Sequence, residues 1–148
     1  MPIVTISKKP KFGISQFDLR VICDEVVTFA LNTEQGPLQP GSAMILINDD
    51  NTEKKVDLVI QIRCWYFEDR YDSCHERADL IRSLIRRAYI DTRTDIQSCS
   101  ADIKIAVCMS YDIDAWSKSK EPTRPKVEMT ETAMMARIQK RCGFITKS

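Results

Sequence analysis

The chain has 148 residues, a length that suits one domain, and 43% of them are hydrophobic while 29% are charged. Its 22 basic and 21 acidic side chains leave a formal net charge of +1, so no net field attracts nucleic acid or an acidic membrane surface. No apolar run approaches the ~20 residues that span a bilayer, and no leader-like segment opens the sequence. We therefore predict no nucleic-acid partner and no membrane span.

The cysteines predict a reducing environment. All six are scattered without a CxxC pair, which favours free thiols in the cytoplasm or another reducing intracellular compartment. The one histidine, His75, follows Cys74 directly, and adjacent residues on a helix do not face the same way. A zinc site there requires Cys64 or Cys99 to converge as well, so we predict no metal site.

The N-terminal part of the sequence predicts a strand, a helix and a second strand. Pro2–Ser7 is rich in β-branched residues and is typical of a strand. Ser15 is placed to cap a helix whose apolar residues recur at helical spacing from Phe17 to Leu31. After a loop over Asn32–Gly41, the apolar run Ser42–Asn48 is typical of a strand covered on both faces.

The middle of the sequence repeats this order. Residues 56–67 (VDLVIQIRCWYF) predict the longest strand, with one core face and one mixed face that meets solvent, a partner subunit or a lumen. The core face carries Leu58, Ile60, Ile62 and Cys64. Ser73 and Glu76 have the spacing of a capping box at the start of a second helix. Asp102–Met109 predicts the fourth strand.

The C-terminal part differs in composition. Residues 117–126 (SKSKEPTRPK) are polar, contain two prolines and predict an extended linker. Thr130 then caps a short helix that ends before Gly143. Its apolar side carries Met134, Met135, Ile138 and Cys142. We predict a domain over residues 1–118 and an extension over 119–148, whose helix docks on its own domain, a neighbouring subunit or a protein partner.

The order of elements predicts an α/β (α+β) fold made of two βαβ units. A right-handed crossover in each unit places two helices on one face of a common four-stranded mixed sheet. Two folds share this order: the ferredoxin-like fold and the tautomerase fold. An RNA-recognition version of the former requires a glycine-containing third strand, which VIQIRCWYF lacks.

The segments Pro2-IVTI, SAMILIN, DLVIQIRCWYF and IKIAVCMSYD resemble the tautomerase superfamily over about the first 118 residues. The likeness is to its 5-carboxymethyl-2-hydroxymuconate isomerase and macrophage migration inhibitory factor branches. It implies a homo-oligomer, a trimer whose sheets line a central barrel. It also implies keto–enol isomerisation of a small enolisable carboxylate without a cofactor.

Within this resemblance, Pro2 is the expected catalytic base. A free α-amino group has a pKa near 7.7–8.0, and burial or nearby cations lower it toward neutrality. Such an amine is a favourable general base. Arg70 lies where the muconate-isomerase branch carries an arginine, and we predict that it binds an anionic oxygen of the substrate. Arg63 is a weaker candidate.

Two alternatives stand beside these site predictions. The alternative to substrate binding is that Arg70 is a solvated loop arginine that pairs with Asp69 or Asp72. The aromatic residues Trp65, Tyr111 and Trp116 wall a pocket, or else pack in the core or an interface.

The sequence also departs from the family pattern. The migration-inhibitory branch carries a lysine after the first helix, whereas the loop TEQGPLQPG here contains no cation. If Met1 remains on the chain, Pro2 is an amide and has no lone pair for catalysis. The alternative function is therefore a catalytically silent structural or binding subunit of a larger assembly with the same fold.

Overall fold

The computed structural model describes residues 2–9, 14–49, 56–91, 104–112 and 128–142. In chain order its elements are β1 (Ile3–Lys8), α1 (Gln16–Leu31), β2 (Met44–Asp49), β3 (Leu58–Trp65), α2 (Glu68–Asp72), α3 (Cys74–Asp91), β4 (Ile105–Asp112) and α5 (Glu131–Cys142). The predicted order of strand, helix, strand, strand, helix, strand is confirmed. The short helix α2 is an addition to it.

The pairing of the strands decides between the two folds that share this order. The sheet of the described residues has the strand order β2-β1-β3-β4. β1 pairs with β2 in parallel, β3 pairs with β4 in parallel, and the central pair β1–β3 is antiparallel. The two strands of each βαβ unit are therefore direct neighbours. A split βαβ unit, as in the ferredoxin-like fold, has another strand between them. The topology is the one expected for a tautomerase-like fold.

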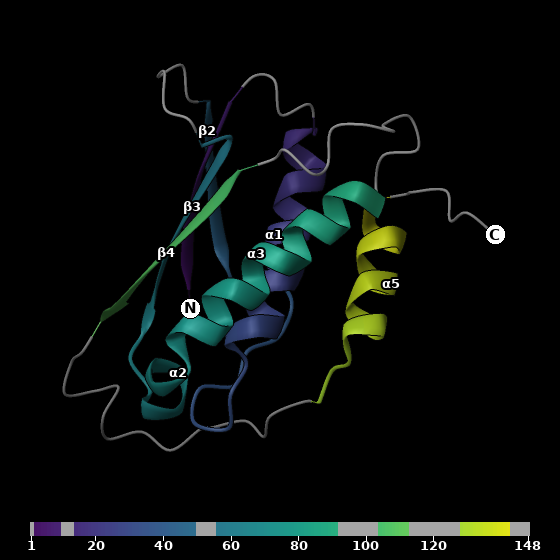
Figure 1. Cartoon of the computed structure of the whole chain (residues 1–148). Coiled ribbons are helices and arrows are strands. Elements are labelled where there is room, and N and C mark those ends of the chain that lie inside the picture. The colour runs from purple at the N-terminus through teal and green to yellow at the C-terminus, as the bar shows by residue number, and fades with distance from the viewer. Residues whose placement is uncertain (1, 10–13, 50–55, 92–103, 113–127, 143–148) are drawn as a thin grey trace.

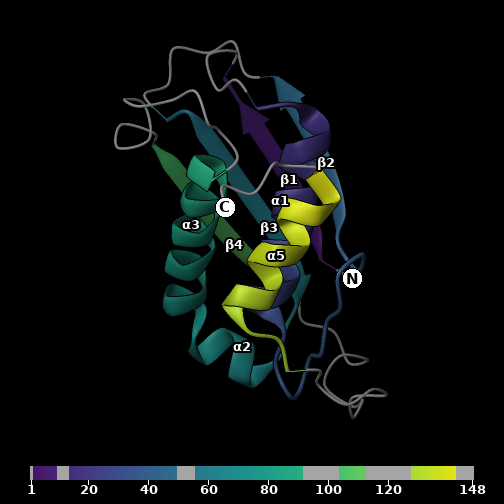
Figure 2. The ribbon, with the colours of Figure 1, turned by 90° about the vertical axis from the view of Figure 1, so that its right-hand side faces the viewer.

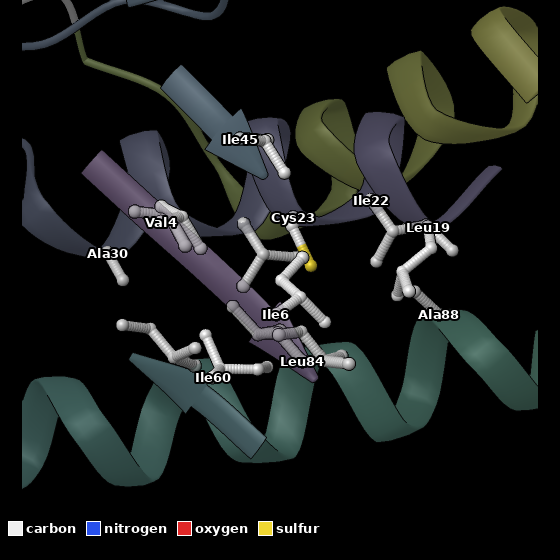
Figure 3. Packing of buried hydrophobic residues seen from close by; sticks show 14 of the residues in the cluster. Val4, Ile6, Leu19, Ile22, Cys23, Ala30, Ile45, Ile60, Leu84 and Ala88 are labelled. Carbon is white, nitrogen blue, oxygen red and sulfur yellow. The ribbon is translucent and has the colours of Figure 1, made fainter. Parts of the chain in front are cut away.

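Helices α1 and α3 cover the same face of the sheet, as predicted (Figure 1). Alternate residues of β1 and β3 point into this layer, and the predicted core face of β3 is buried. Figure 3 shows Ile6 of β1 between Cys23 of α1 and Leu84 of α3, all three in the same buried cluster as Val4. The N-cap prediction is also confirmed, because the Asp18 amide donates to the Ser15 hydroxyl at 3.1 Å.

Helix α5 forms a third layer on the outer side of α1, away from the sheet (Figures 1 and 2). Thr130 caps it as predicted, accepting a hydrogen bond from the Ala133 amide at 3.1 Å. Its apolar residues Met134, Met135 and Ile138 are buried in the core cluster. The sequence left three docking sites for this helix open: its own domain, a neighbouring subunit or a protein partner. The apolar side of α5 packs on its own domain.

The second face of β2 is exposed in the single chain, contrary to the prediction of a strand covered on both faces. Met44 and Leu46 are 44% and 50% exposed. β2 is an edge strand, and these two residues lie on the face of the sheet opposite α1 and α3, which we call the open face. The apolar residues of β2 that point away from the helices therefore lie on the open face, which no described element of this chain covers.

The predicted capping box at Ser73 is wrong. The Ser73 hydroxyl donates to the Asp69 carbonyl at 2.8 Å and accepts from Nε of Arg77 at 2.6 Å. These contacts arise because α2 ends at Asp72, so that Ser73 is both the C-cap of α2 and the residue directly before α3. Strand β4 ends at Asp112, three residues beyond the predicted Met109. The predicted linker over residues 117–126, Trp116 and Gly143 lie outside the described residues.

Candidate functional site

One end of the sheet brings together residues from both βαβ units. β1 and β2 begin there, while β3 and β4 end there, because the central pair is antiparallel and the outer pairs are parallel. Ile3 is paired with Arg63, so the next position places Pro2 beside Cys64. Cys64 in turn is paired with Tyr111. The predicted base therefore lies at the end of the sheet from which α2 continues.

Pro2 is buried directly before β1, on the side of the strand that carries Val4. Its carbonyl accepts a hydrogen bond from the Met44 amide at 2.9 Å, which joins it to the start of β2. A proline costs no ladder hydrogen bond at this position. Residue 1 lies outside the described residues, so the catalytic role of Pro2 stays a prediction.

Arg70 is buried and holds three segments of backbone. Only 2% of it is exposed. Its Nε donates to the Leu31 carbonyl at 3.1 Å, Nη1 to the Trp65 carbonyl at 3.1 Å, and Nη2 to the Gly36 carbonyl at 2.6 Å. The alternative of a solvated loop arginine is wrong, because α2 directs this side chain inward. The guanidinium has five N–H groups; these contacts use three of them, and Arg70 also forms a hydrogen bond with the Cys64 side chain.

The loop after α1 approaches Arg70 closely because it has a glycine there. A Cβ at Gly36 would lie 2.5 Å from Nη2 of Arg70 and 2.6 Å from Cδ2 of Phe67. The guanidinium carbon of Arg70 lies 5.0 Å from the centroid of the Phe67 ring, a cation–π contact. A side chain at Gly36 would displace one or both of them.

Arg77 is a second arginine at this end that the sequence analysis did not single out. Its Nη1 donates to the Ala30 carbonyl, next to the Leu31 carbonyl that Arg70 binds. The last turn of α1 has no basic residue of its own. Two arginines from α2 and α3 therefore neutralise the carbonyls at the C-terminal end of α1 and its helix dipole.

Burial shapes the titration of the groups around Arg70. It lowers the pKa of Arg70, while the neighbouring Cys64 acts in the opposite direction. It raises the pKa of the Cys64 thiol, although Arg70 opposes this. Burial, and after it the thiols of Cys64 and Cys74, raise the pKa of Tyr111 to about 12. At neutral pH the Cys64 thiol and the Tyr111 phenol beside Arg70 are therefore uncharged.

Three tyrosines line this end of the sheet. The ring centroids of Tyr66 and Tyr71 lie 5.4 Å apart, and those of Tyr71 and Tyr111 lie 5.3 Å apart in an edge-to-face arrangement. Such aromatic contacts fix ring orientations. Tyr111 was one of the residues predicted to line a pocket. Tyr71 lies in α2, and Tyr66 directly follows β3. No periodicity in the sequence could have brought them together.

The weaker candidate Arg63 lies elsewhere, on the open face. Its Nε donates to the carboxylate of Asp112 at 2.8 Å, and both side chains are largely exposed. A hollow of about 410 Å³ lies on the same face. It is lined by Ile3, Thr5, Gln61, Ile62, Arg63, Cys108, Met109 and Ser110. This hollow contains neither Pro2 nor Arg70.

Two further predictions concern metals and membranes. Among the described residues, no three or more histidine, cysteine or acidic side chains gather as metal ligands. Of the candidate ligands, Cys99 lies outside the described residues. Within the described part of the chain, no helix combines the length and the apolar character that crossing a bilayer requires.

Comparison with known proteins gives structural likenesses only. No protein-family model and no curated protein matches the sequence. A crystal structure of 5-carboxymethyl-2-hydroxymuconate delta-isomerase is similar, with 11% identity, a TM-score of 0.45 and coverage of 90% of this chain and 92% of that one.

Two more solved structures are similar at the same level. Leishmania major MIF2 has 10% identity and a TM-score of 0.42 over 77% of this chain and 92% of its own. Pt0534 inactivated by 2-oxo-3-pentynoate has 10% identity and a TM-score of 0.40 over 74% and 86%. These values are too low to bear on activity, and the fold assignment rests on the strand pairing described above.

Proposed function

We propose that the protein is a cofactor-free tautomerase that moves a proton on a small enolisable carboxylate, with Pro2 as the base. The observation that carries the proposal is the position of Pro2. It is buried at the end of the sheet where Arg70 and Tyr111 also lie. A secondary amine in such a place combines apolar surroundings with a nearby cation, and both lower its pKa toward neutrality.

The roles follow from charge and donor capacity. Pro2 takes a proton from the carbon next to a carbonyl and returns it elsewhere along the conjugated system. Arg70 has donor capacity beyond its three backbone contacts and its hydrogen bond with Cys64, and this capacity serves to bind the anionic oxygen of the substrate. Tyr111 remains a neutral phenol at physiological pH, so it can donate to a developing enolate.

Intact-mass measurement is the first test. A mass lacking one methionine supports a free Pro2 amine, and a full-length mass overturns the catalytic proposal. If the amine is free, Pro2→Ala should abolish phenylpyruvate tautomerisation and leave the fold intact. Pro40→Ala, in the loop after α1, is the matched control and should retain the activity. Equal activity of Pro2→Ala and the parent protein would also overturn the proposal.

We propose in addition that the protein is a homo-oligomer, a trimer in which the open faces meet. The exposed Met44 and Leu46 support this, because large apolar residues on one sheet face are typical of an interface. Light scattering at micromolar concentration should give three times the mass of one chain. A monomer, with Leu46→Lys indistinguishable from the parent, would refute it.

A second candidate function is supported by the same arginine. The guanidinium of Arg70 is already bound to three backbone carbonyls, and the loop over residues 32–43 contains no Lys or Arg. A catalytically silent binding or structural subunit needs no substrate cation. A free Pro2 amine without tautomerase activity on any α-keto acid would favour this function over the first.

A further inference from the structure

The outer side of α1 contains two carboxylates that a sequence would place in solvent. Asp24 is 5% exposed and Glu25 is 0% exposed, in the middle of the helix. A buried carboxylate is costly unless it is paired and hydrogen-bonded. The layer that covers this side of α1 is α5 (Figure 2).

α5 supplies the cations. Nε of Arg137 lies 3.2 Å from both oxygens of Glu25, and Nη1 of Arg141 lies 2.7 Å from one of them. The same Nη1 lies 3.0 Å from the carboxylate of Asp24. Burial lowers the pKa of Arg141, but the hydrogen bonds to Glu25 and Asp24 outweigh it and raise the pKa overall. Docking of α5 therefore neutralises the carboxylates on α1.

Asp24 makes a second contact, to the loop after α1 (residues 32–43). Both of its oxygens accept from the Gly41 amide, at 3.0 and 2.9 Å. Gly41 has a φ of 90°, a conformation that glycine adopts without strain. The same loop is bound to Arg70 through the Gly36 carbonyl. Asp24 thus joins α5 to a loop that also packs on the candidate site.

We propose that α5 is a clamp on this loop: its arginines hold Asp24 and Glu25, and Asp24 holds Gly41, so that docking of α5 fixes the loop conformation. The physical reason is that one carboxylate serves both partners. When α5 is docked, Asp24 is buried and oriented by Arg141 toward Gly41. When α5 is released, water solvates Asp24 and competes for the Gly41 amide. Coupling of this kind is reciprocal, so loop order also favours docking.

Amide hydrogen exchange in the full-length protein tests the clamp without reference to any catalytic activity. Arg137→Gln removes the hydrogen bonds between two charged groups that hold α5 on Glu25, and such hydrogen bonds are stronger than those between neutral groups. The variant should therefore release α5 more often, and exchange at Gly41 should accelerate by about tenfold or more. Arg137 touches Glu25 but neither Asp24 nor Gly41, so this effect can arise only through α5. Arg141→Gln should give an equal or larger effect.

Arg87→Gln is the matched control. It removes an exposed ion pair with Glu131 of α5 at 3.2 Å, and exposed pairs contribute little to stability. Gly41 exchange should remain at the parent rate in this variant, and core amides of β1 should stay protected in all three. If only Arg141→Gln accelerates Gly41, the effect is a lost local contact and the clamp is refuted. Unchanged exchange in both arginine variants also refutes it.

Discussion

Replacing Arg70 by methionine tests whether this buried arginine supports the fold. Methionine keeps much of the side-chain length but donates no hydrogen bond. The change leaves the carbonyls of Leu31, Trp65 and Gly36 without their donor, in a site where Arg70 is 2% exposed. The loop over residues 32–43, the end of α1 and the end of β3 therefore lose a common partner.

The magnitude follows from two opposing terms. Hydrogen bonds to a charged group contribute about 1.5–3 kcal/mol each, so three of them give about 5–9 kcal/mol. Removing the buried charge recovers several kcal/mol of its desolvation cost. We expect Arg70→Met to lower the free energy of unfolding by about 3–5 kcal/mol, a large part of the 5–15 kcal/mol that is usual for a domain.

Urea unfolding followed by circular dichroism measures this difference. Arg87→Met is the matched control, because Arg87 forms an exposed ion pair with Glu131 away from the open face and should cost less than about 1 kcal/mol. The stability of Arg70→Lys should fall between those of Arg70→Met and Arg87→Met, since one ammonium cannot reach three carbonyls on different segments. An Arg70→Met variant as stable as Arg87→Met would refute the structural role. Lost activity at unchanged stability would instead assign Arg70 to substrate binding alone.

Three further outcomes are expected. Gly36→Ala should destabilise the fold by about 1–3 kcal/mol through overpacking against Arg70, and an unchanged urea midpoint would contradict this. The pKa of Tyr111 is raised from 10.0 to about 12 in the folded protein, so its contribution to stability is present below pH 10 and is lost between pH 10 and 12. Tyr111→Phe should therefore flatten the alkaline fall in stability, and an unaltered profile would argue against the assignment. Burial, with Asp24 second, raises the pKa of Cys23 to about 12, so thiol reagents should modify Cys23 only on unfolding. Labelling of Cys23 in the folded protein, located by peptide mass mapping, would contradict this.

The elements that were predictable from the sequence are those whose residues alternate or recur regularly. β3 alternates buried and exposed residues as expected, and Ser15 caps α1 through a contact only three residues away. The exposure of Met44 was not predictable, because an apolar run is the same whether a sheet or another chain covers its second face. The local sequence pattern therefore predicts that a strand or helix forms, whereas the burial of its residues depends on which other elements or chains pack against it.

The candidate site was predictable only in part for the same reason. Pro2 is recognisable from its position, whereas two of the three backbone contacts of Arg70 join residues more than 30 positions apart. Asp24 and Glu25 look like solvent-facing residues of an amphipathic helix until α5 is in place. Charged residues buried by a distant partner carry no periodic signal in the sequence.

The third layer also has a consequence for the order in which the chain folds. The ion pairs between α1 and α5 join residues 112, 116 and 117 positions apart. Such contacts close long loops and carry a large closure entropy, so they form late. During synthesis Glu25 is made long before Arg137 and Arg141, and it must remain hydrated until they arrive. We therefore expect the sheet with α1 and α3 to assemble first, while the burial of Glu25 marks the completion of folding.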